Sequence, residues 1–201
     1  MSNNTEIKPV ITPIGSALWA KITEPQSSQY NPTPMYSMDI VYTPEEANDF
    51  KLQLNNLLDA YYDEVHAGLN DAKKKTLTKN DIFKEHTDKD GNLTGNLVIK
   101  TKQYGKSMKG DVMPMPISDA SGKVIPDFKT LVANGSKVRA KVYPKPYHMA
   151  STNSVGISLR LNAVQIVELI PYEQAGGGFG SVDGGYTAPE QPAPVEADED
   201  F

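Results

Sequence analysis

Apolar and polar residues alternate most regularly near the end of the chain, in residues 154–172. Apolar side chains stand at every second position there, at Val155, Ile157, Leu159, Leu161 and Ala163. This period of two predicts a strand with one buried face. In residues 164–170 both faces are largely apolar, which predicts that this half of the strand is covered on both sides or bends around a core. Pro171 is expected to end the strand.

Four earlier segments alternate in the same way and are predicted to be strands that pair with this one. They are residues 17–22, 35–42, 97–102 and 137–143. The last is the most regular, with Val138, Ala140 and Val142 directed inward and Lys137, Arg139, Lys141 and Tyr143 directed outward. Pro144 and Pro146 are expected to end it and to leave Tyr147 on a rigid turn.

The first of these strands is predicted to have two distinct faces. Leu18, Ala20 and Ile22 share one face, and Trp19 and Lys21 share the other. The segment that follows, residues 25–34, is rich in proline, serine and asparagine. It is predicted to form a loop before the second strand.

A helix is predicted after the second strand. Thr43 is a suitable N-cap, Pro44 suits the first turn, and Glu46 completes a capping box. Apolar residues then recur at helical spacing, at Phe50, Leu54, Leu57, Leu58, Tyr61 and Val65. The helix is expected to end near Gly68. Its single apolar stripe indicates that it packs on the surface of a domain.

The remaining segments show weaker patterns. Residues 70–96 are polar and are predicted to form a solvated loop, whereas residues 104–135 are rich in glycine and proline and predict turns and short strands. Five strands with one helix in a long connection fit a mainly β fold over residues 1–172, a five-stranded Greek-key barrel of the OB type. A β-sandwich with one helix is the alternative.

Acidic and basic residues are unevenly distributed along the chain, whose net charge is −5. Residues 173–201 carry seven acidic side chains and no lysine or arginine, so residues 1–172 carry 18 acidic and 20 basic ones. Ten basic and three acidic side chains lie in residues 97–147. This distribution predicts a folded body with a basic patch, followed by a flexible, glycine-rich acidic tail over residues 173–201.

The composition excludes several kinds of site. The chain has no cysteine, which excludes disulfides and thiolate metal sites, and we expect no cofactor. No run of about 18 apolar residues occurs and the N-terminus lacks a signal-peptide core, so we expect an intracellular protein without a membrane span. The histidines stand apart from any nucleophile pattern, so we expect no enzyme.

One binding surface is predicted, in which cations and aromatic side chains share a sheet face. It joins Lys100, Lys102, Arg139, Lys141 and Tyr147, with Trp19, Lys21 and Lys109 as further members. Spaced cations match the phosphates of a nucleic acid, and aromatic rings stack on unpaired bases. An OB barrel presents such a face on its middle strands. An ordinary solvated sheet face is the alternative interpretation.

Three short motifs resemble known sites but have simpler interpretations. Residues 88–91 lack the first and twelfth ligands of a calcium loop around them and predict a turn. Residues 121–123 lack the upstream glycine of a phosphate-binding loop and predict a hairpin turn. The glycines at 176–178 follow a strand but precede no helix, so a dinucleotide site is not expected.

The chain ends in acidic residues followed by an aromatic ring, at Asp198, Glu199, Asp200 and Phe201. A tail that only solubilises a protein does not need an aromatic tip. Acidic groups beside an apolar tip fit a basic pocket with an apolar floor, which predicts a protein partner for this tail.

Several of these segments resemble the single-stranded DNA-binding proteins of T-seven-like bacteriophages. The resemblance covers residues 17–178 and the tip of the tail. It rests on residues 36–40, 137–141, 146–147, 155–169 and 176–178. The closing strand and the acidic end with a final Phe are its most specific parts, although this tail is shorter and less densely charged than those of the family.

The resemblance implies an OB fold, a homodimer and no catalysis. It implies binding of single-stranded DNA without sequence specificity, in phage replication, recombination and repair in the cytoplasm of the infected host. It places DNA contacts at Arg139, Lys141 and Tyr147, and also at Lys100 and Lys102. The acidic tail would contact the phage DNA polymerase and helicase-primase. The alternative is a phage structural or scaffolding module whose sheet binds another protein.

Overall fold

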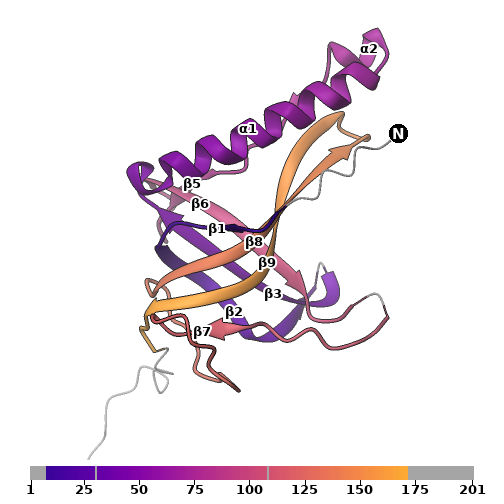
Figure 1. Cartoon of the computed structure of the whole chain (residues 1–201). Coiled ribbons are helices and arrows are strands. Elements are labelled where there is room, and N and C mark those ends of the chain that lie inside the picture. The colour runs from indigo at the N-terminus through magenta and orange to yellow at the C-terminus, as the bar shows by residue number, and fades with distance from the viewer. Residues whose placement is uncertain (1–7, 30, 108, 172–201) are drawn as a thin grey trace, which may run out of the picture.

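The computed structural model of the protein describes residues 8–29, 31–107 and 109–171, and Figure 1 shows the arrangement of its elements. The strands are β1 (Val10–Ile11), β2 (Gly15–Ser28), β3 (Asn31–Tyr42), β4 (Thr78–Lys79), β5 (Lys84–Thr87), β6 (Leu93–Tyr104), β7 (Ile117–Ser118), β8 (Lys137–Met149) and β9 (Ser154–Glu168). The helices are α1 (Pro44–Gly68) and α2 (Asp71–Lys74). The five segments predicted as strands lie in β2, β3, β6, β8 and β9, so these predictions are confirmed.

These five strands form a closed barrel in the order β2, β3, β6, β9 and β8, with β8 pairing back to β2. The barrel is closed where Gly15 lies opposite Val138, and β1 extends this seam with Val10 opposite Val142. β6 and β9 run parallel, and the other barrel pairs are antiparallel. This is the connectivity of an OB barrel, so the predicted fold is confirmed and the sandwich alternative is wrong.

Helix α1 lies across one end of the barrel (Figure 1). The Thr43 hydroxyl accepts a hydrogen bond from the Glu46 N–H (3.2 Å), and the Glu46 carboxylate accepts one from the Thr43 N–H (2.8 Å). This capping box and the helix end at Gly68 confirm the predicted bounds. The apolar stripe packs on the barrel, and its buried members are Ala47, Phe50, Leu54 and Leu58.

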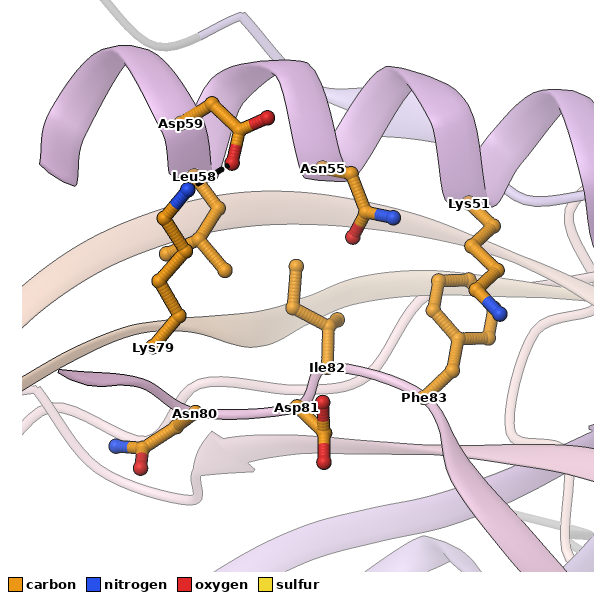
Figure 2. A pocket seen from close by; sticks show the side chains of 9 residues that line it. All are labelled: Lys51, Asn55, Leu58, Asp59, Lys79, Asn80, Asp81, Ile82 and Phe83. Atoms are coloured by element: carbon orange, nitrogen blue, oxygen red, sulfur yellow. Dashed lines mark hydrogen bonds and ion pairs between the residues drawn. The ribbon is translucent and has the colours of Figure 1, made fainter. Parts of the chain in front are cut away.

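Residues 70–96 are not the solvated loop that their polarity predicts. They contain α2, β4 and β5, and residues 79–83 run beneath α1 (Figure 2). Leu77 and Phe83 are buried, and the Phe83 ring meets the Phe50 ring edge-on with 5.9 Å between centroids. The prediction was wrong because two isolated apolar residues are enough to hold a short segment in place when they pack against the helix above it.

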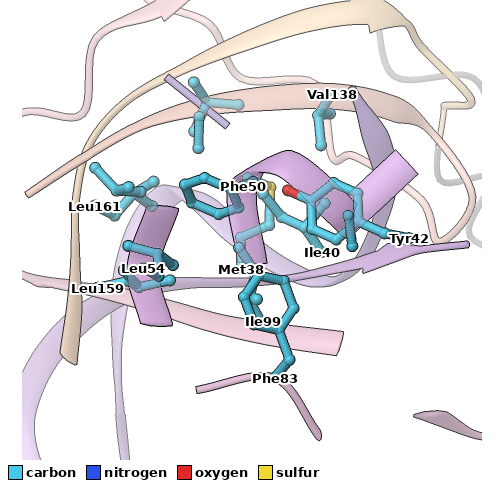
Figure 3. Close-up of a cluster of buried hydrophobic side chains, with 14 of the residues drawn as sticks. Met38, Ile40, Tyr42, Phe50, Leu54, Phe83, Ile99, Val138, Leu159 and Leu161 are labelled. Atoms are coloured by element: carbon cyan, nitrogen blue, oxygen red, sulfur yellow. The ribbon is translucent and has the colours of Figure 1, made fainter. Parts of the chain in front are cut away.

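The barrel interior and the apolar stripe of α1 share one hydrophobic core (Figure 3). Met38 and Ile40 of β3, Ile99 of β6 and Leu161 of β9 are fully buried there. Successive side chains of a strand point to opposite faces. The residues between these core positions therefore line the outer wall of the barrel, and the wall is where a binding surface has to be sought.

Two strand pairs continue through prolines at which the sequence pattern predicts a strand end or a loop. β8 continues past Pro144 and Pro146 to Met149, so Tyr147 lies in a strand and not on a turn. Among the described residues, β1 pairs with β8 only as far as Val142, so no described strand pairs with this edge of β8 beyond that point and the edge accepts prolines. β2 and β3 likewise extend into residues 25–34, where register shifts interrupt their ladder, so the predicted loop is a hairpin.

The turns predicted at residues 88–91 and 121–123 are confirmed. In each, an aspartate carboxylate, Asp88 or Asp119, accepts hydrogen bonds from backbone N–H groups two and four residues further on.

In the part of the chain that the structure describes, no helix is long and apolar enough to cross a membrane. The same residues include no group of three or more histidine, aspartate and glutamate side chains that could hold a metal ion.

Candidate nucleic-acid interface

Five residues from five strands stand in register across the outer wall of the barrel. In sheet order they are Lys21 of β2, Ser37 of β3, Lys102 of β6, Arg160 of β9 and Tyr143 of β8. Residues paired in register point to the same face, with Cβ atoms about 5 Å apart, and the three cations are exposed. We call this line the cationic row. It crosses β3 and β6, the middle strands on which OB barrels bind oligonucleotides.

The charges of the cationic row are available to a ligand. Neither Lys21 nor Lys102 has an ion-pair partner among the described residues. The Arg160 Nε atom donates to the Gln103 Oε1 atom (2.6 Å), a bond that orients the guanidinium and uses one of its several N–H donors. A polyanion lying along the row would therefore meet three cations and then the Tyr143 ring.

Lys100, a predicted contact residue, is engaged differently. Its Nζ atom lies 3.5 Å from the Asp39 Oδ2 atom, and the two residues are paired in register on β6 and β3. Burial raises the pKa of the Asp39 carboxyl, and the nearby Lys100 ammonium opposes that rise. Lys100 thus belongs to an ion pair beside the cationic row and not to the row itself.

The outward face of β8 carries a second set of cations and rings. Its members are Arg139, Lys141, Tyr143, Lys145 and Tyr147, which we call the β8 stripe. The stripe meets the cationic row at Tyr143. Near the N-terminal end of the β8 stripe, the Arg139 Nε atom donates to the Gln165 Oε1 atom (2.5 Å), and Lys141 lies opposite Ile11 of β1. The structure therefore brings Arg139 and Lys141 to the same outer wall as Lys102, but across β9 from it.

Tyr147 is held by contacts that the sequence does not reveal. Its hydroxyl accepts a hydrogen bond from the Asn80 Nδ2 atom (3.3 Å). Its ring packs on Gly156, where an added Cβ atom would lie 2.5 Å from the hydroxyl oxygen. The side chain also borders an open hollow of about 590 Å³, with Asn80, Asp81, Phe83, Lys84 and Glu85. Tyr147 is therefore half-buried and held in place by these contacts. The hollow beside its ring has space for a planar group.

A smaller hollow of about 260 Å³ lies between α1 and residues 79–83 (Figure 2). Lys79, one of the lysines that line it, is already engaged. Its Nζ atom lies 2.6 Å from the Asp59 Oδ1 atom and 4.6 Å from the centre of the Tyr62 ring. This ion pair and cation–π contact tie residues 79–83 to the helix, and we assign the hollow no ligand.

Trp19 marks a break in the predicted alternation of β2. The ladder with β3 gains one residue between Leu18 and Lys21, which is a bulge, so Leu18 faces outward, contrary to the prediction. Trp19 adopts a φ of 52°, and its N–H donates to the Asn134 Oδ1 atom (2.9 Å). This left-handed backbone costs about 1–3 kcal/mol in a bulky residue. The bulge leaves Trp19 66% exposed, so its ring is accessible to a ligand, and its role in stacking stays a prediction.

The other predicted residues lie away from the row or outside the described residues. Lys109 is exposed on the hairpin that follows β6, where Lys106 forms a bridge with Val112. The predicted partner-binding tip, Asp198, Glu199, Asp200 and Phe201, lies outside the described residues.

Sequence reasoning missed Arg160, Tyr143 and Lys145 as site residues. Arg160 alternates with Leu159 and Leu161, a signal that places it on an outward face. Only the parallel register of β6 and β9 places it beside Lys102.

Comparison with known proteins finds similarity in structure but not in sequence. No protein-family model matches the chain, and no curated protein matches it. The crystal structure of gp2.5, a single-stranded DNA-binding protein encoded by bacteriophage T7, is similar over 90% of this chain and 99% of that chain, with a TM-score of 0.67 and 19% identity. The single-stranded DNA-binding protein from bacteriophage Enc34, in complex with single-stranded DNA, is similar over 82% of this chain and 89% of that chain, with a TM-score of 0.57 and 11% identity.

At these identities the similarity concerns the fold. It covers 99% of the chain in the T7 structure and 89% of the chain in the Enc34 structure. The resemblance that the sequence segments indicate is therefore confirmed at the level of fold: the chain has the fold of the single-stranded DNA-binding proteins of bacteriophages T7 and Enc34.

Proposed function

We propose that the protein binds single-stranded DNA without sequence specificity, as a phage-type binding protein in DNA replication, recombination and repair. The observation that carries this proposal is the cationic row, which crosses the middle strands of an OB barrel and ends at an aromatic ring. Similarity to two phage proteins described as single-stranded DNA-binding supports it. The proposed activity is binding, with no catalytic step.

A single strand suits this surface better than a duplex does. Lys21, Lys102 and Arg160 are each exposed and able to neutralise a phosphate, and Tyr143 and Tyr147 offer rings to bases. Stacking on a protein ring needs an unpaired base, because the faces of paired bases are covered by their neighbours in the duplex. Contacts to phosphates and base faces carry no sequence information, so affinity should differ little among sequences.

We expect tight binding to oligo-dT and much weaker binding to a duplex of the same length. Contact with about four phosphates, three from the cationic row and one from the β8 stripe, gives a slope near −3 in a plot of log affinity against log salt. A fluorescence titration of labelled oligonucleotides at several salt concentrations measures both quantities. Equal affinity for duplex, or affinity that does not change with salt, would contradict the proposal and favour the scaffolding alternative.

We further propose that residues 1–172 form the DNA-binding domain of a homodimer in the cytoplasm of the infected host, and that residues 173–201 form a separate tail. The seven acidic and no basic side chains of residues 173–201 support this division.

The tail recruits the phage DNA polymerase and helicase-primase, with Phe201 filling an apolar pocket and Asp198, Glu199 and Asp200 meeting basic groups around it. As a tethered anion it also competes with DNA for the basic wall.

Deleting residues 173–201 should therefore have opposite effects on two measurements. The truncated protein should bind oligo-dT more tightly at low salt, because the competing anion is gone, and should lose binding to the polymerase and helicase-primase. Phe201→Ala is the matched variant, since it keeps every charge: DNA affinity should stay nearly unchanged while partner binding falls. Oligonucleotide titrations and pull-downs with the two partners test this. A truncated protein with weaker DNA binding and intact partner binding would show that the tail is itself a DNA-binding or solubilising element.

A further inference from the structure

The centre of the outer wall holds an acid beside the cations. Asp39 lies on β3 opposite Lys100 of β6, and the next outward pair along the same two strands is Ser37 opposite Lys102. Outward residues of one strand are about 7 Å apart, so Asp39 is a direct neighbour of the cationic row. On its other side Asp39 lies opposite Leu18 of β2, which adds no charge.

Asp39 is sheltered, whereas its partner is not. The Asp39 side chain is 18% exposed and that of Lys100 is 69% exposed, with 3.5 Å between the Lys100 Nζ and Asp39 Oδ2 atoms. Burial disfavours a charged carboxylate that lacks a partner, and it raises the pKa of the Asp39 carboxyl while the Lys100 ammonium opposes the rise. Lys100 therefore compensates Asp39, and the pair presents no net charge to a ligand.

We infer that Asp39 sets the path and the strength of single-stranded DNA binding. By neutralising Lys100 it directs the strand along the cationic row through Lys102, and by withholding the Lys100 charge from the phosphates it weakens the complex. This inference rests on the proposed function. Two unit charges about 7 Å apart change an affinity about threefold in water, and more at the lower effective dielectric of a protein surface. Moderated affinity suits a protein that must be displaced from DNA during replication.

Asp39→Asn tests this role, because asparagine keeps the shape of the side chain and removes its charge. We expect binding to oligo-dT that is about three to ten times tighter at low salt. The salt slope should become steeper by about 0.7, because the released Lys100 gains a phosphate. The matched control Asp63→Asn removes an exposed charge on α1 and should change neither quantity. Unchanged or weaker binding by Asp39→Asn would overturn the inference.

Lys100 variants distinguish charge compensation from direct contact with DNA. Lys100→Met alone should weaken binding, because the Asp39 charge is then uncompensated. The double variant Asp39→Asn with Lys100→Met exchanges one neutral pair for another and should bind with wild-type affinity. A double variant that bound as weakly as Lys100→Met would mean that Lys100 itself contacts DNA, and the inference would be wrong.

The proposed function and this inference fail in different ways. If the wild-type protein did not bind oligo-dT, the function would be wrong, whatever the variants did. If the wild type bound and the Asp39 variants did not follow the expected order, only the role of Asp39 would be wrong. Thermal unfolding followed by circular dichroism checks that each variant is folded, and the double variant gives a second test that does not depend on Asp39→Asn alone.

Discussion

Replacing Lys21 and Lys102 together with alanine is expected to lower the affinity for single-stranded DNA about 25-fold at about 0.1 M salt and to flatten the salt slope by about 1.4. Both lysines are exposed on the cationic row, and neither has an ion-pair partner among the described residues. One phosphate contact to a single strand contributes about 0.7 to the slope. Each contact therefore raises the affinity about fivefold for each tenfold fall in salt concentration below 1 M. Separate contacts multiply in affinity.

The matched control removes two lysines that lie elsewhere, with Lys51→Ala on α1 and Lys89→Ala in the turn before β6. Both side chains are exposed, so the net charge changes equally while the cationic row stays intact. Oligo-dT titrations over a salt series give affinity and slope for both double variants, and thermal unfolding confirms that they are folded. If the control weakened binding as much as the row variant does, affinity would depend on net charge alone and the cationic row would not be the binding surface.

The barrel strands were predictable because their signal is local. Val138, Ala140 and Val142 are each buried, as the alternation of β8 predicts, and the exposed residues between them are polar. The start of α1 is equally local, since Thr43 and Glu46 stand three residues apart and bond to each other's backbone. Patterns of this kind specify which residues face the core, and in a closed barrel this also specifies which residues line the outer wall.

The composition of the candidate site was less predictable, because it depends on register between distant strands. Lys102 and Arg160 are neighbours only because β6 and β9 pair in parallel, and no pattern within either strand contains that information. The distinction between Lys100 and Lys102 likewise depends on Asp39, a residue of another strand. From the sequence, both lysines are equivalent outward residues of one strand.

Other errors came from features that only the neighbouring strands explain. Pro144 and Pro146 predict a strand end when the strand is considered alone, but beyond the last contact with β1 no described strand pairs with that edge of β8, which therefore accepts them. The outward turn of Leu18 follows from the bulge at Trp19, one inserted residue that reverses the phase of the alternation. Such insertions leave no signature in a pattern of period two.

Tyr147→Ala is expected to cost about 1–3 kcal/mol of binding free energy for single-stranded DNA, whereas Tyr147→Phe should keep most of it. The ring borders an open hollow on the same outward strand face as Tyr143 and Lys145, so a base can stack beside it while Lys145 meets a phosphate. The hydroxyl makes one long hydrogen bond with Asn80 (3.3 Å). Its loss in Tyr147→Phe should change stability by only about 0.5–1.5 kcal/mol.

A purely structural role for Tyr147 leads to different results. The ring packs on Gly156, so its removal must lower stability to some extent, and affinity and unfolding have to be measured on the same samples. Tyr61→Ala is the matched control, because Tyr61 is a partly buried tyrosine of α1 that packs against the core. This control should lower the melting temperature and leave oligo-dT affinity unchanged. Tyr147→Ala should lower both; if it melted several degrees lower but bound oligo-dT as the wild type does, Tyr147 would be a packing residue and the stacking role would be wrong.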